Sequence, residues 1–533
     1  MHTKSQWTTG LTAAEDTMSR TALLLLSCVL AAPAALSQER FDVTETTVAQ
    51  IHGAFASGSL TARELVQLYL ERIEAYDQQG PRINSVITLN RDALAAADRL
   101  DAAFKTTGMV GPLHGIPIML KDQIDAAGMP TTLGSVLFRD YYPDRNAFVT
   151  DKLEAAGAII LAKVTLGELA AGDAHGSLYG STRNPYDLVR TVGGSSGGSA
   201  ASIAANFATL AVGQEALASI RRPAAWNSIV GMRPTAGLVS RGGVFSGWPQ
   251  LAGSLGPMTR TVEDTAILLD VLVGYDPEDP LTAHGVGHHD IPYRNFLDVN
   301  GLRGARLGIL REPIGIGSEP DSADFAKVDA VFERSIRELA AAGAVVVDPI
   351  AIPRLAELLA KRGSNPADND AAFAEYFGRS RNFPFASIAA MKASPEFAAV
   401  TNFGKALFDG NGDVARHYAY LTAREELMHH FLKVLADYDL DAIVYKAVEH
   451  QPTLIADGIA PPFVNTKGSP FLNTFLIYVP TITVPAGFTA DNLPVGIAFI
   501  GRPYDDGLML KLAYSYEQAT RHRRPPSATP PLD

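Results

Sequence analysis

A run of glycine and serine residues, Gly-Gly-Ser-Ser-Gly-Gly-Ser at positions 193–199, is the first candidate for chemistry in this sequence. Glycine lets the backbone approach a ligand closely and present its N–H groups, as phosphate-binding loops do where they open a helix. The phosphate-binding pattern ends in Gly-Lys-Ser or Gly-Lys-Thr, however, and this run contains no lysine. Taken alone, the run predicts a turn whose serine caps the small-residue helix that follows at 200–205.

Two further residues, one on each side of the run, favour nucleophilic catalysis instead. Lys121 lies upstream in the segment 115–122, and Ser219 lies downstream of Ser195 in the segment 218–224. A serine hydroxyl is a weak nucleophile and needs a base within hydrogen-bond reach. Lysine can be that base only when it is neutral, and burial lowers its pKa from the usual value of ~10.4.

The surroundings of Lys121 suit such a base. It follows the apolar segment 116–120, which predicts a buried strand and hence a buried amine. The adjoining Asp122 would raise the pKa of the lysine if its carboxylate faced the amine, so we expect Asp122 to point away and bond to backbone. The alternative is a solvated lysine at the end of a strand.

With these three elements the chain resembles the amidase signature family of serine hydrolases. The resemblance covers most of the chain, from about residue 41 to about residue 521. It implies a Ser–Ser–Lys triad that needs no cofactor and no metal. In that triad Ser219 is the nucleophile, Ser195 is the bridging proton relay and Lys121 is the base.

Other residues near the motif carry secondary predictions. The resemblance implies a cis peptide bond between Gly194 and Ser195. We expect Ser196 to support the array by hydrogen bonding. His114, which precedes Lys121, offers an alternative Ser-His-Asp triad, but the family does not use it, so we expect a hydrogen-bonded turn histidine.

The segment before Ser219 departs from the family's usual Thr-Gly-Gly-Ser or Thr-Asp-Gly-Ser, because this chain has Glu-Ala-Leu-Ala-Ser at 215–219. An oxyanion hole needs backbone donors rather than side chains, and the available N–H groups are those of Ala216, Leu217, Ala218 and Ser219. Positive φ is costly without glycine, and Leu217 adds bulk. Either the loop tolerates these residues, or the site is altered or inactive. Arg221 pairs with Glu215 or is a solvated charge.

The elements that position these residues predict an α/β fold. Apolar segments expected as strands alternate with helical segments, and this alternation indicates a sheet covered by helices on both faces, with ligands at strand ends. The resemblance implies a large, mixed, twisted sheet. The expected strands are 116–120, 158–162, 209–212, 304–310, 344–347, 441–444, 481–484 and 495–499. The expected helices include 147–156, 166–171, 323–342, 471–477 and 508–519.

The segment 355–435 differs from the alternating strands and helices around it, because its sequence pattern is mostly helical and little of it predicts a strand. We interpret it as a helical insertion near the substrate cleft within a single domain, residues 38–533. The substrate pocket is expected to involve this insertion, Trp248 and the segment 463–471.

The N-terminus predicts export. An apolar run at 21–35 follows a short basic start, and small residues precede a predicted cleavage site before Gln38, so 1–37 is interpreted as a signal peptide. Translation starts more plausibly at Met18 than at the first residue. A membrane anchor is the alternative, but the run is shorter than the ~20 residues that a span needs. The single cysteine, Cys28, lies in this run. The mature protein is expected to be periplasmic or secreted, without stable membrane insertion.

Composition limits the partners. The chain has 533 residues, a net charge of −12 and 47% apolar residues, which fits a large soluble domain and argues against nucleic acid as a partner. The expected partner is a small-molecule amide, and the sequence leaves the choice between a monomer and a homodimer open.

The resulting hypothesis is an exported amide hydrolase. Alternatives within the family are hydrolases of aryl acylamides, carbamates, oligoamides or peptide amides, and a component of a tRNA-dependent amidotransferase. The alternative outside enzymes is a catalytically impaired envelope protein that binds amides, for which residues 216–218 are the only support.

Overall fold

The computed structural model describes residues 41–245, 253–363, 366–408 and 413–532. Contacts divide the chain at Asp42, and residues 42–533 form one compact unit, to which all the features below belong. The expected signal peptide 1–37, Cys28 and Trp248 lie outside the described residues. Among the described helices, none combines the length and apolar character needed to cross a bilayer.

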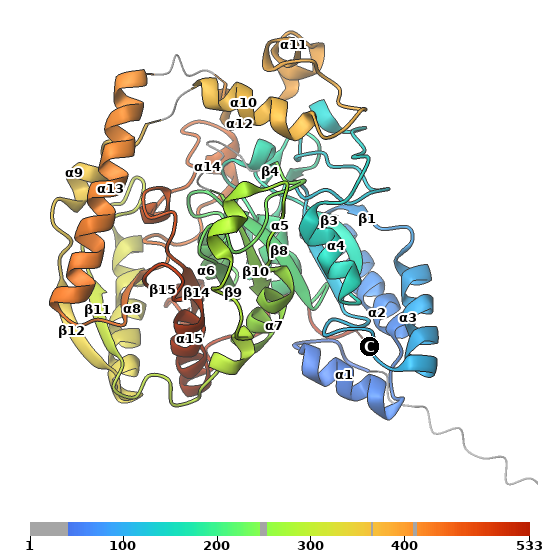
Figure 1. Ribbon diagram of the computed structural model, residues 1–533, viewed down its shortest axis with the longest axis horizontal. Helices are drawn as coiled ribbons and strands as arrows, with labels where there is room; N and C mark the ends of the chain where they lie inside the picture. Colours follow the sequence, from blue (N-terminus) through green and yellow to red (C-terminus); the bar gives the residue numbers. More distant parts are fainter. Residues whose placement is uncertain (1–40, 246–252, 364–365, 409–412, 533) are drawn as a thin grey trace, which may run out of the picture. The chain divides into compact units, whose positions relative to one another are not determined.

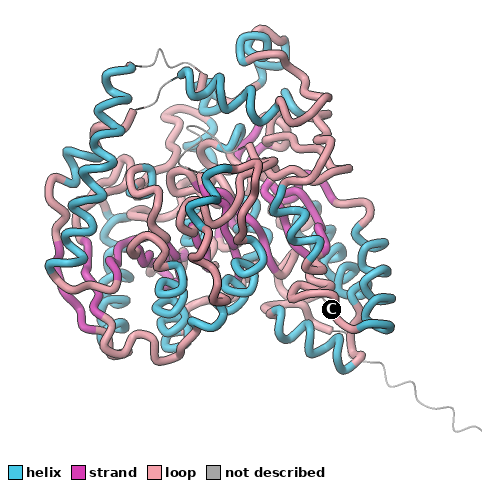
Figure 2. The backbone as a smooth tube through the Cα atoms, viewed as in Figure 1, coloured by secondary structure: helices cyan, strands magenta, loops and turns pink. Residues whose placement is uncertain are grey.

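An eleven-stranded mixed sheet forms the centre of this unit (Figures 1 and 2). Its strands are β1 Val86–Leu89, β2 Pro117–Lys121, β3 Ile159–Val164, β8 Leu210–Glu215, β9 Val230–Arg233, β10 Ser254–Thr259, β11 Arg306–Leu310, β12 Val345–Ile350, β13 Ala442–Lys446, β14 Thr481–Phe488 and β15 Pro494–Ile500. Their order is β1-β3-β2-β8-β10-β9-β14-β15-β13-β11-β12. β2 is parallel to β3 and β8, β11 is parallel to β12 and β13, and the other neighbours are antiparallel.

Helices cover both faces of this sheet. Those discussed here are α5 Gly197–Ala204, α6 Arg221–Trp226, α7 Val262–Leu272, α8 Ala323–Ala341 and α15 Asp506–Thr520. Alternate residues of a strand point to opposite faces. On β15, a Cβ added at Gly496 would lie 3.0 Å from Ala225 of α6, whereas the ring of Phe499 packs edge-on against Tyr516 of α15, with centroids 6.3 Å apart. α6 and α15 therefore lie on opposite faces, and the predicted α/β architecture is confirmed.

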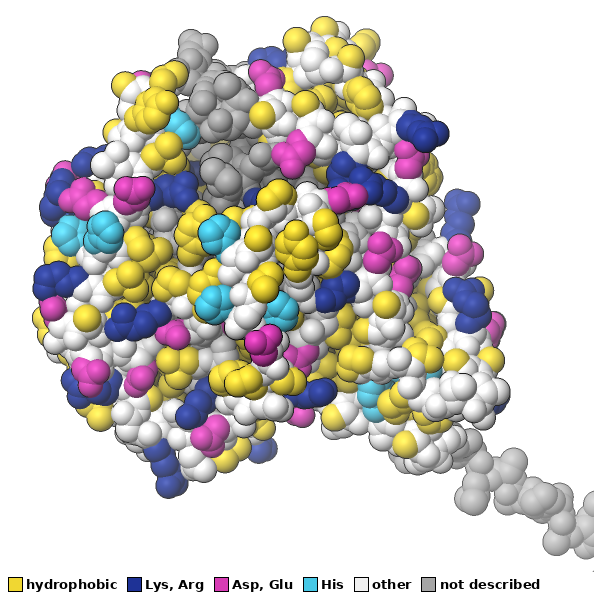
Figure 3. Space-filling model, viewed as in Figure 1, with side chains coloured by type: hydrophobic (Ala, Val, Ile, Leu, Met, Phe, Trp, Pro, Cys, Tyr) yellow, Lys and Arg dark blue, Asp and Glu magenta, His cyan; other side chains and the backbone are white. Residues whose placement is uncertain are grey.

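Further helices pack outside this core. They are α1 Val48–Ser57, α2 Ala62–Arg72, α3 Ala93–Thr107 and α4 Phe148–Ala155 (Figure 1). Two small hairpins lie between β3 and β8 in the chain, and they pair β4 His175–Gly176 with β5 Gly180–Ser181 and β6 Arg183–Asn184 with β7 Asp187–Thr191. On the face seen in Figure 3, basic and acidic side chains are interspersed.

Two of the helix predictions made from the sequence are wrong. The segment 166–171 contains only a short 3-10 turn, Glu168–Ala170, in which Leu169 has a φ of 56°. The segment 471–477 likewise contains a 3-10 turn, Leu472–Thr474. Both segments are apolar enough to suggest a helix, but both are loops that pack beside the candidate site or in the core, where tertiary contacts override local preference.

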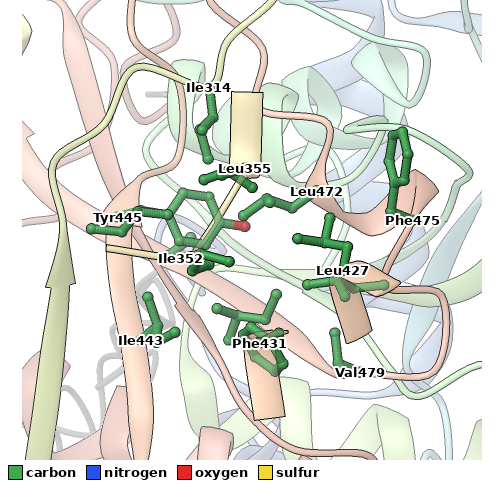
Figure 4. Packing of buried hydrophobic residues seen from close by; sticks show 14 of the residues in the cluster. Ile314, Ile352, Leu355, Leu427, Phe431, Ile443, Tyr445, Leu472, Phe475 and Val479 are labelled. Atoms are coloured by element: carbon green, nitrogen blue, oxygen red, sulfur yellow. The ribbon is translucent and has the colours of Figure 1, made fainter. Parts of the chain in front are cut away.

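The segment 355–435 contains several helices and packs on the rest of the unit through two apolar clusters. Its elements are α9 Leu355–Leu359, α10 Pro366–Phe377, α11 Ile388–Lys392, the 3-10 turn Pro395–Ala399, α12 Asn402–Ala406 and α13 Val414–Asp437. In the first cluster, Leu427 and Phe431 of α13 pack with Ile443 and Tyr445 of β13 (Figure 4). In the second, the ring of Phe377 stacks on Phe138 with centroids 5.1 Å apart. The first cluster holds both ends of the segment, since it also contains Leu355 of α9, and the second cluster holds its middle.

The burial of the first cluster predicts how substitutions in it change the free energy of unfolding. Phe431 is fully buried, so Phe431→Ala should lower the free energy of unfolding by about 3–5 kcal/mol, because it removes buried apolar surface and leaves a cavity. Tyr418→Ala on the same helix is the matched control, since Tyr418 is 65% exposed; its effect should stay within about 0.5 kcal/mol. Denaturant unfolding measures both variants, and equal losses would contradict the assignment of this cluster to the core.

Candidate active site

Lys121 is held in the middle of the sheet. It is the last residue of β2, which lies between β3 and β8, and every residue of this strand is buried. Its Nζ donates a hydrogen bond of 2.7 Å to Ser195 Oγ and one of 3.1 Å to the carbonyl oxygen of Gln214. Burial lowers the pKa of Lys121 well below its usual value, although the charge of Glu215 acts in the opposite direction. The alternative of a solvated lysine is therefore wrong.

Asp122 points away from the amine, as expected. Its carboxylate accepts a hydrogen bond of 3.0 Å from the backbone N–H of Thr132, and its other oxygen lies 3.1 Å from Nζ of the buried Lys163. Burial raises the pKa of Asp122, and the charge of Lys163 counteracts the rise. The negative charge next to the candidate base is thus compensated by a second lysine.

The glycine–serine run forms a loop that opens helix α5. Its peptide bond between Gly194 and Ser195 is cis, which confirms the expectation. The Ser195 carbonyl oxygen accepts a hydrogen bond of 3.0 Å from the N–H of Gly167. Glycine is required at position 198, because a Cβ there would lie 2.4 Å from the backbone oxygen of Thr165. Close packing against this neighbouring loop fixes the Ser195 backbone.

Ser196 does not cap α5, so the interpretation of the run as a simple serine-capped turn is wrong. Its hydroxyl donates a hydrogen bond of 3.0 Å to the carbonyl oxygen of Gln214 and accepts one of 3.2 Å from the Gln214 N–H. Its own N–H donates to the carbonyl oxygen of Ser219 at 3.0 Å. Ser196 therefore ties the run both to β8 and to the segment that carries Ser219.

Ser219 lies in the turn between β8 and α6 and is partly exposed. It lines a cavity of ≈ 190 Å³ together with Gly194, Gln214 and the turn residues 216–218. Its hydroxyl has no hydrogen-bond partner among the described residues, so the structure links Lys121 to Ser195 but does not form the Ser195–Ser219 bond.

The turn at 216–218 does not need glycine. Among the described residues with positive φ, neither Ala216, Leu217 nor Ala218 is found, so alanine and leucine are unstrained here. Within the described structure, no protein acceptor is bound to the N–H groups of Ala216, Leu217, Ala218 and Ser219. These free donors line the cavity beside the Ser219 hydroxyl.

Arg221 is structural and pairs with Glu215, as one of the two expectations stated. Its Nε donates to the Glu215 carboxylate at 2.7 Å, and both side chains are buried. The same carboxylate accepts from the N–H groups of Ile220 and Arg221 at 2.9 and 3.0 Å. Arg221 also donates to the carbonyl oxygen of Leu217 at 2.6 Å and to the hydroxyl of Tyr445 at 2.8 Å. This ion pair closes the turn on itself.

His114 belongs to a buried turn. Its Nδ1 accepts a hydrogen bond of 3.3 Å from the N–H of Val110, and its ring packs against Phe104 with centroids 5.6 Å apart. Its carbonyl oxygen bonds the ring of His52 at 3.0 Å. Within the described chain it makes no hydrogen bond to Lys121 or to either motif serine, so a Ser-His-Asp triad is not formed.

Several residues of the cavity were not identified from the sequence. Arg222 donates to the carbonyl oxygen of Gly194 at 2.8 Å and pairs with Asp173 at 2.8 Å, so it holds one side of the cis peptide bond. Its position directly after Arg221 was the only available signal. Arg362 and Phe403 reach the cavity from the segment 355–435, and no local motif marks either of them.

Comparisons with known proteins identify the family. A family model described as Amidase matches residues 64–510. The chain is similar to a glutamyl-tRNA(Gln) amidotransferase subunit of Gloeobacter violaceus, with 34% identity over 90% of this chain and 98% of the relative. It is also similar to a probable amidase of Arabidopsis thaliana, with 32% identity over 95% of this chain and 96% of the relative. Among solved structures, the native peptide amidase from Stenotrophomonas maltophilia superimposes with a TM-score of 0.80 and 34% identity, over 91% of this chain and 98% of that chain.

Proposed function

The chain belongs to the amidase family, an amide-hydrolysing enzyme family, and we propose that it acts through an acyl-enzyme on Ser219, with Lys121 as base and Ser195 as proton relay. The observation that carries this proposal is the buried Lys121 amine, 2.7 Å from the Ser195 hydroxyl, beside a cavity that holds Ser219 and free backbone donors. The proposed reaction needs neither a metal nor a cofactor.

The steps follow from these positions. Lys121, when neutral, draws a proton from Ser195 as Ser195 takes the proton of Ser219, and the Ser219 oxygen attacks the amide carbon. The N–H groups of the turn at 216–218 and of Ser219 stabilise the oxyanion. The proton then passes to the leaving nitrogen, and water attacks the acyl-enzyme by the reverse relay. The Ser195–Ser219 contact forms in this scheme when substrate fills the cavity, since catalytic hydrogen bonds often tighten only in the bound state.

The substrate within the class of amides is a finer proposal. We favour a primary amide at the end of a peptide, because the peptide amidase of Stenotrophomonas maltophilia combines high structural similarity with 34% identity. Aryl acylamides, carbamates and oligoamides are the alternatives. A panel of these compounds, scored by released amine or ammonia, discriminates among them.

Specific observations favour two other functions. The similar glutamyl-tRNA(Gln) amidotransferase subunits, such as those of Gloeobacter violaceus and a Cyanothece species, favour a role within such an amidotransferase. That role predicts amide transfer to glutamyl-tRNA(Gln) rather than hydrolysis of peptide amides. The Ala-Leu-Ala sequence at 216–218 favours an impaired binding protein, but the free N–H groups there support catalysis instead.

Substitutions test the assignment of the triad. Ser219→Ala and Lys121→Ala should each lower kcat/KM for amide hydrolysis by at least about 10⁴-fold, because each removes a member of one catalytic unit. A fluorophosphonate probe should label Ser219 in the native protein, as read by mass spectrometry. Ser202→Ala is the matched control, since Ser202 lies in α5 and its hydroxyl donates to the Ser199 carbonyl oxygen at 3.1 Å, away from the triad. A folded native protein without label or turnover would establish the impaired binding protein.

The protonation state of Lys121 should make hydrolysis depend on pH. Because burial lowers the pKa of Lys121, its neutral form prevails at a pH where free lysine is charged, and kcat/KM should rise as pH passes through this lowered pKa. The ascending limb should lie well below the usual lysine value, and Lys121→Ala should abolish it. An ascending limb centred near the usual ~10.4 would contradict the assignment. By linkage, the unfolded state binds this proton more tightly, so the same shift makes stability rise with pH between the two pKa values.

We propose that the protein is exported, because of the apolar run at 21–35. Expression of the full chain in a Gram-negative host should place the enzyme in the periplasm, with an N-terminus at Gln38 after removal of 1–37. Cell fractionation and N-terminal sequencing measure this outcome. A cytoplasmic protein that keeps residues 21–35 would contradict it.

A further inference from the structure

Large apolar side chains are exposed together in one concavity beside the active site. Phe403, Leu454, Ile459 and Phe463 are 41%, 38%, 49% and 44% exposed, and all four line a groove of ≈ 700 Å³. The groove lies between α12 and α14 (Ile455–Ile459); both helices are labelled in the upper half of Figure 1. Because exposed apolar surface is unfavourable in water, its concentration in one concavity marks a binding surface.

The groove is continuous with the catalytic cavity. Phe403 and Ala171 line both of them, and a Cβ on the adjacent Gly172 would lie 2.8 Å from the Phe403 ring. The catalytic cavity of ≈ 190 Å³ is smaller than the ~300–1,000 Å³ usual for ligand sites, whereas the groove falls within that range. A substrate that filled the catalytic cavity alone would therefore be a small amide.

The far wall of the groove is held in an unfavourable backbone conformation. Phe463 has a φ of 56°, a region that large side chains rarely adopt. The segment is fixed by a hydrogen bond of 2.7 Å from the N–H of Val464 to the carbonyl oxygen of Asp457 and by one of 2.9 Å from the N–H of Asp173 to Asn465 Oδ1. Such strain persists only where the surroundings enforce it, and it concentrates at ligand-binding positions. The exposed Phe463 ring is thus presented to the groove by a fixed loop.

The polar groups of the groove indicate what kind of chain it takes. The side-chain amide of Asn402 and the amide nitrogen of Asn465 line the groove and make no hydrogen bond within the described part of the chain. An alkyl chain would bury these donors and leave them unpaired, which is costly, whereas a peptide backbone offers acceptors for them. Apolar contacts interrupted by free amides match an extended peptide with apolar side chains.

We propose that this groove binds the chain of a peptide amide with apolar side chains, whose C-terminal amide passes Phe403 to reach Ser219. The peptide is then the acyl part of the substrate, and the small catalytic cavity has to accommodate only the amide head and the departing ammonia. This assignment rests on the proposed role of Ser219 for its kinetic test but not for its binding test.

The kinetic test compares N-acetyl-leucinamide with the N-acetylated tetrapeptide amide Ala-Phe-Val-Leu-NH₂. In the native enzyme, kcat/KM should be at least about tenfold higher for the tetrapeptide amide, and Ile459→Ala or Phe463→Ala should each lower this ratio by about tenfold. Ile291→Ala is the matched control, since Ile291 is 57% exposed and does not line the groove; it should keep the ratio. Equal kcat/KM for the two amides in the native enzyme would overturn the proposal.

The binding test does not depend on turnover. Calorimetry with the Ser219→Ala protein should give a Kd for the tetrapeptide amide at least about tenfold below that for N-acetyl-leucinamide, and adding Phe463→Ala should remove this difference. Equal affinities for the two amides would overturn the groove as a peptide site. Dodecanamide binding as tightly as the tetrapeptide amide would overturn the peptide chemistry. If the native enzyme failed to hydrolyse any amide while the tetrapeptide bound as expected, only the proposed function would fail.

Discussion

The structure depends on one dehydrated amine, that of Lys121, held at the end of a central strand against the hydroxyl of Ser195. Burial removes this amine from bulk solvent, so the neighbouring groups decide whether it stays neutral. Two carboxylates lie close in sequence or space, and each is committed to a different cation. Asp122 pairs with Lys163, and Glu215 pairs with Arg221. Burial lowers the pKa of Lys121 and outweighs the opposing charge of Glu215.

The same Glu215–Arg221 pair explains how the site works without glycine before Ser219. A carboxylate that accepts the N–H groups of Ile220 and Arg221 fixes the far end of the turn, and the Arg221 guanidinium holds the Leu217 carbonyl oxygen. With these acceptors occupied, the N–H groups of residues 216–218 point to no protein partner within the described chain. The contacts of Glu215 and Arg221 therefore orient these N–H groups. The turn forms without positive φ at residues 216–218, so it needs no glycine there.

The sequence was informative where local chemistry decides the outcome. Apolar runs located β2, β3 and β8, and the motif residues Lys121, Ser195 and Ser196 lie together as expected. It failed where tertiary packing decides. β10 runs through Gly256 and Pro257, which are poor strand formers, and it is held by antiparallel pairing with β8 and β9. The apolar residues Leu169 and Ala170 adopt positive φ because they form a cavity wall rather than a helix. Arg362 and Phe403 line the cavity from a segment that is distant in the sequence, and no local motif predicts this contact.

The residues proposed for catalysis and the residues that line the groove lie on different parts of the structure. The residues proposed for bond breaking lie on β2, on the loop before α5 and on the turn after β8, all of which belong to the rigid sheet and its first contacts. The residues that shape the approach lie on α12, on α14 and on the chain beside them, and α12 is flanked by Val400 and Leu407 of the second apolar cluster. Changes in these outer helices can alter the size and polarity of the groove without moving Lys121, because no described hydrogen bond joins α12 or α14 to the triad residues. A single set of hydrolytic positions can therefore be combined with different walls, which is the arrangement expected when one fold serves many amide substrates.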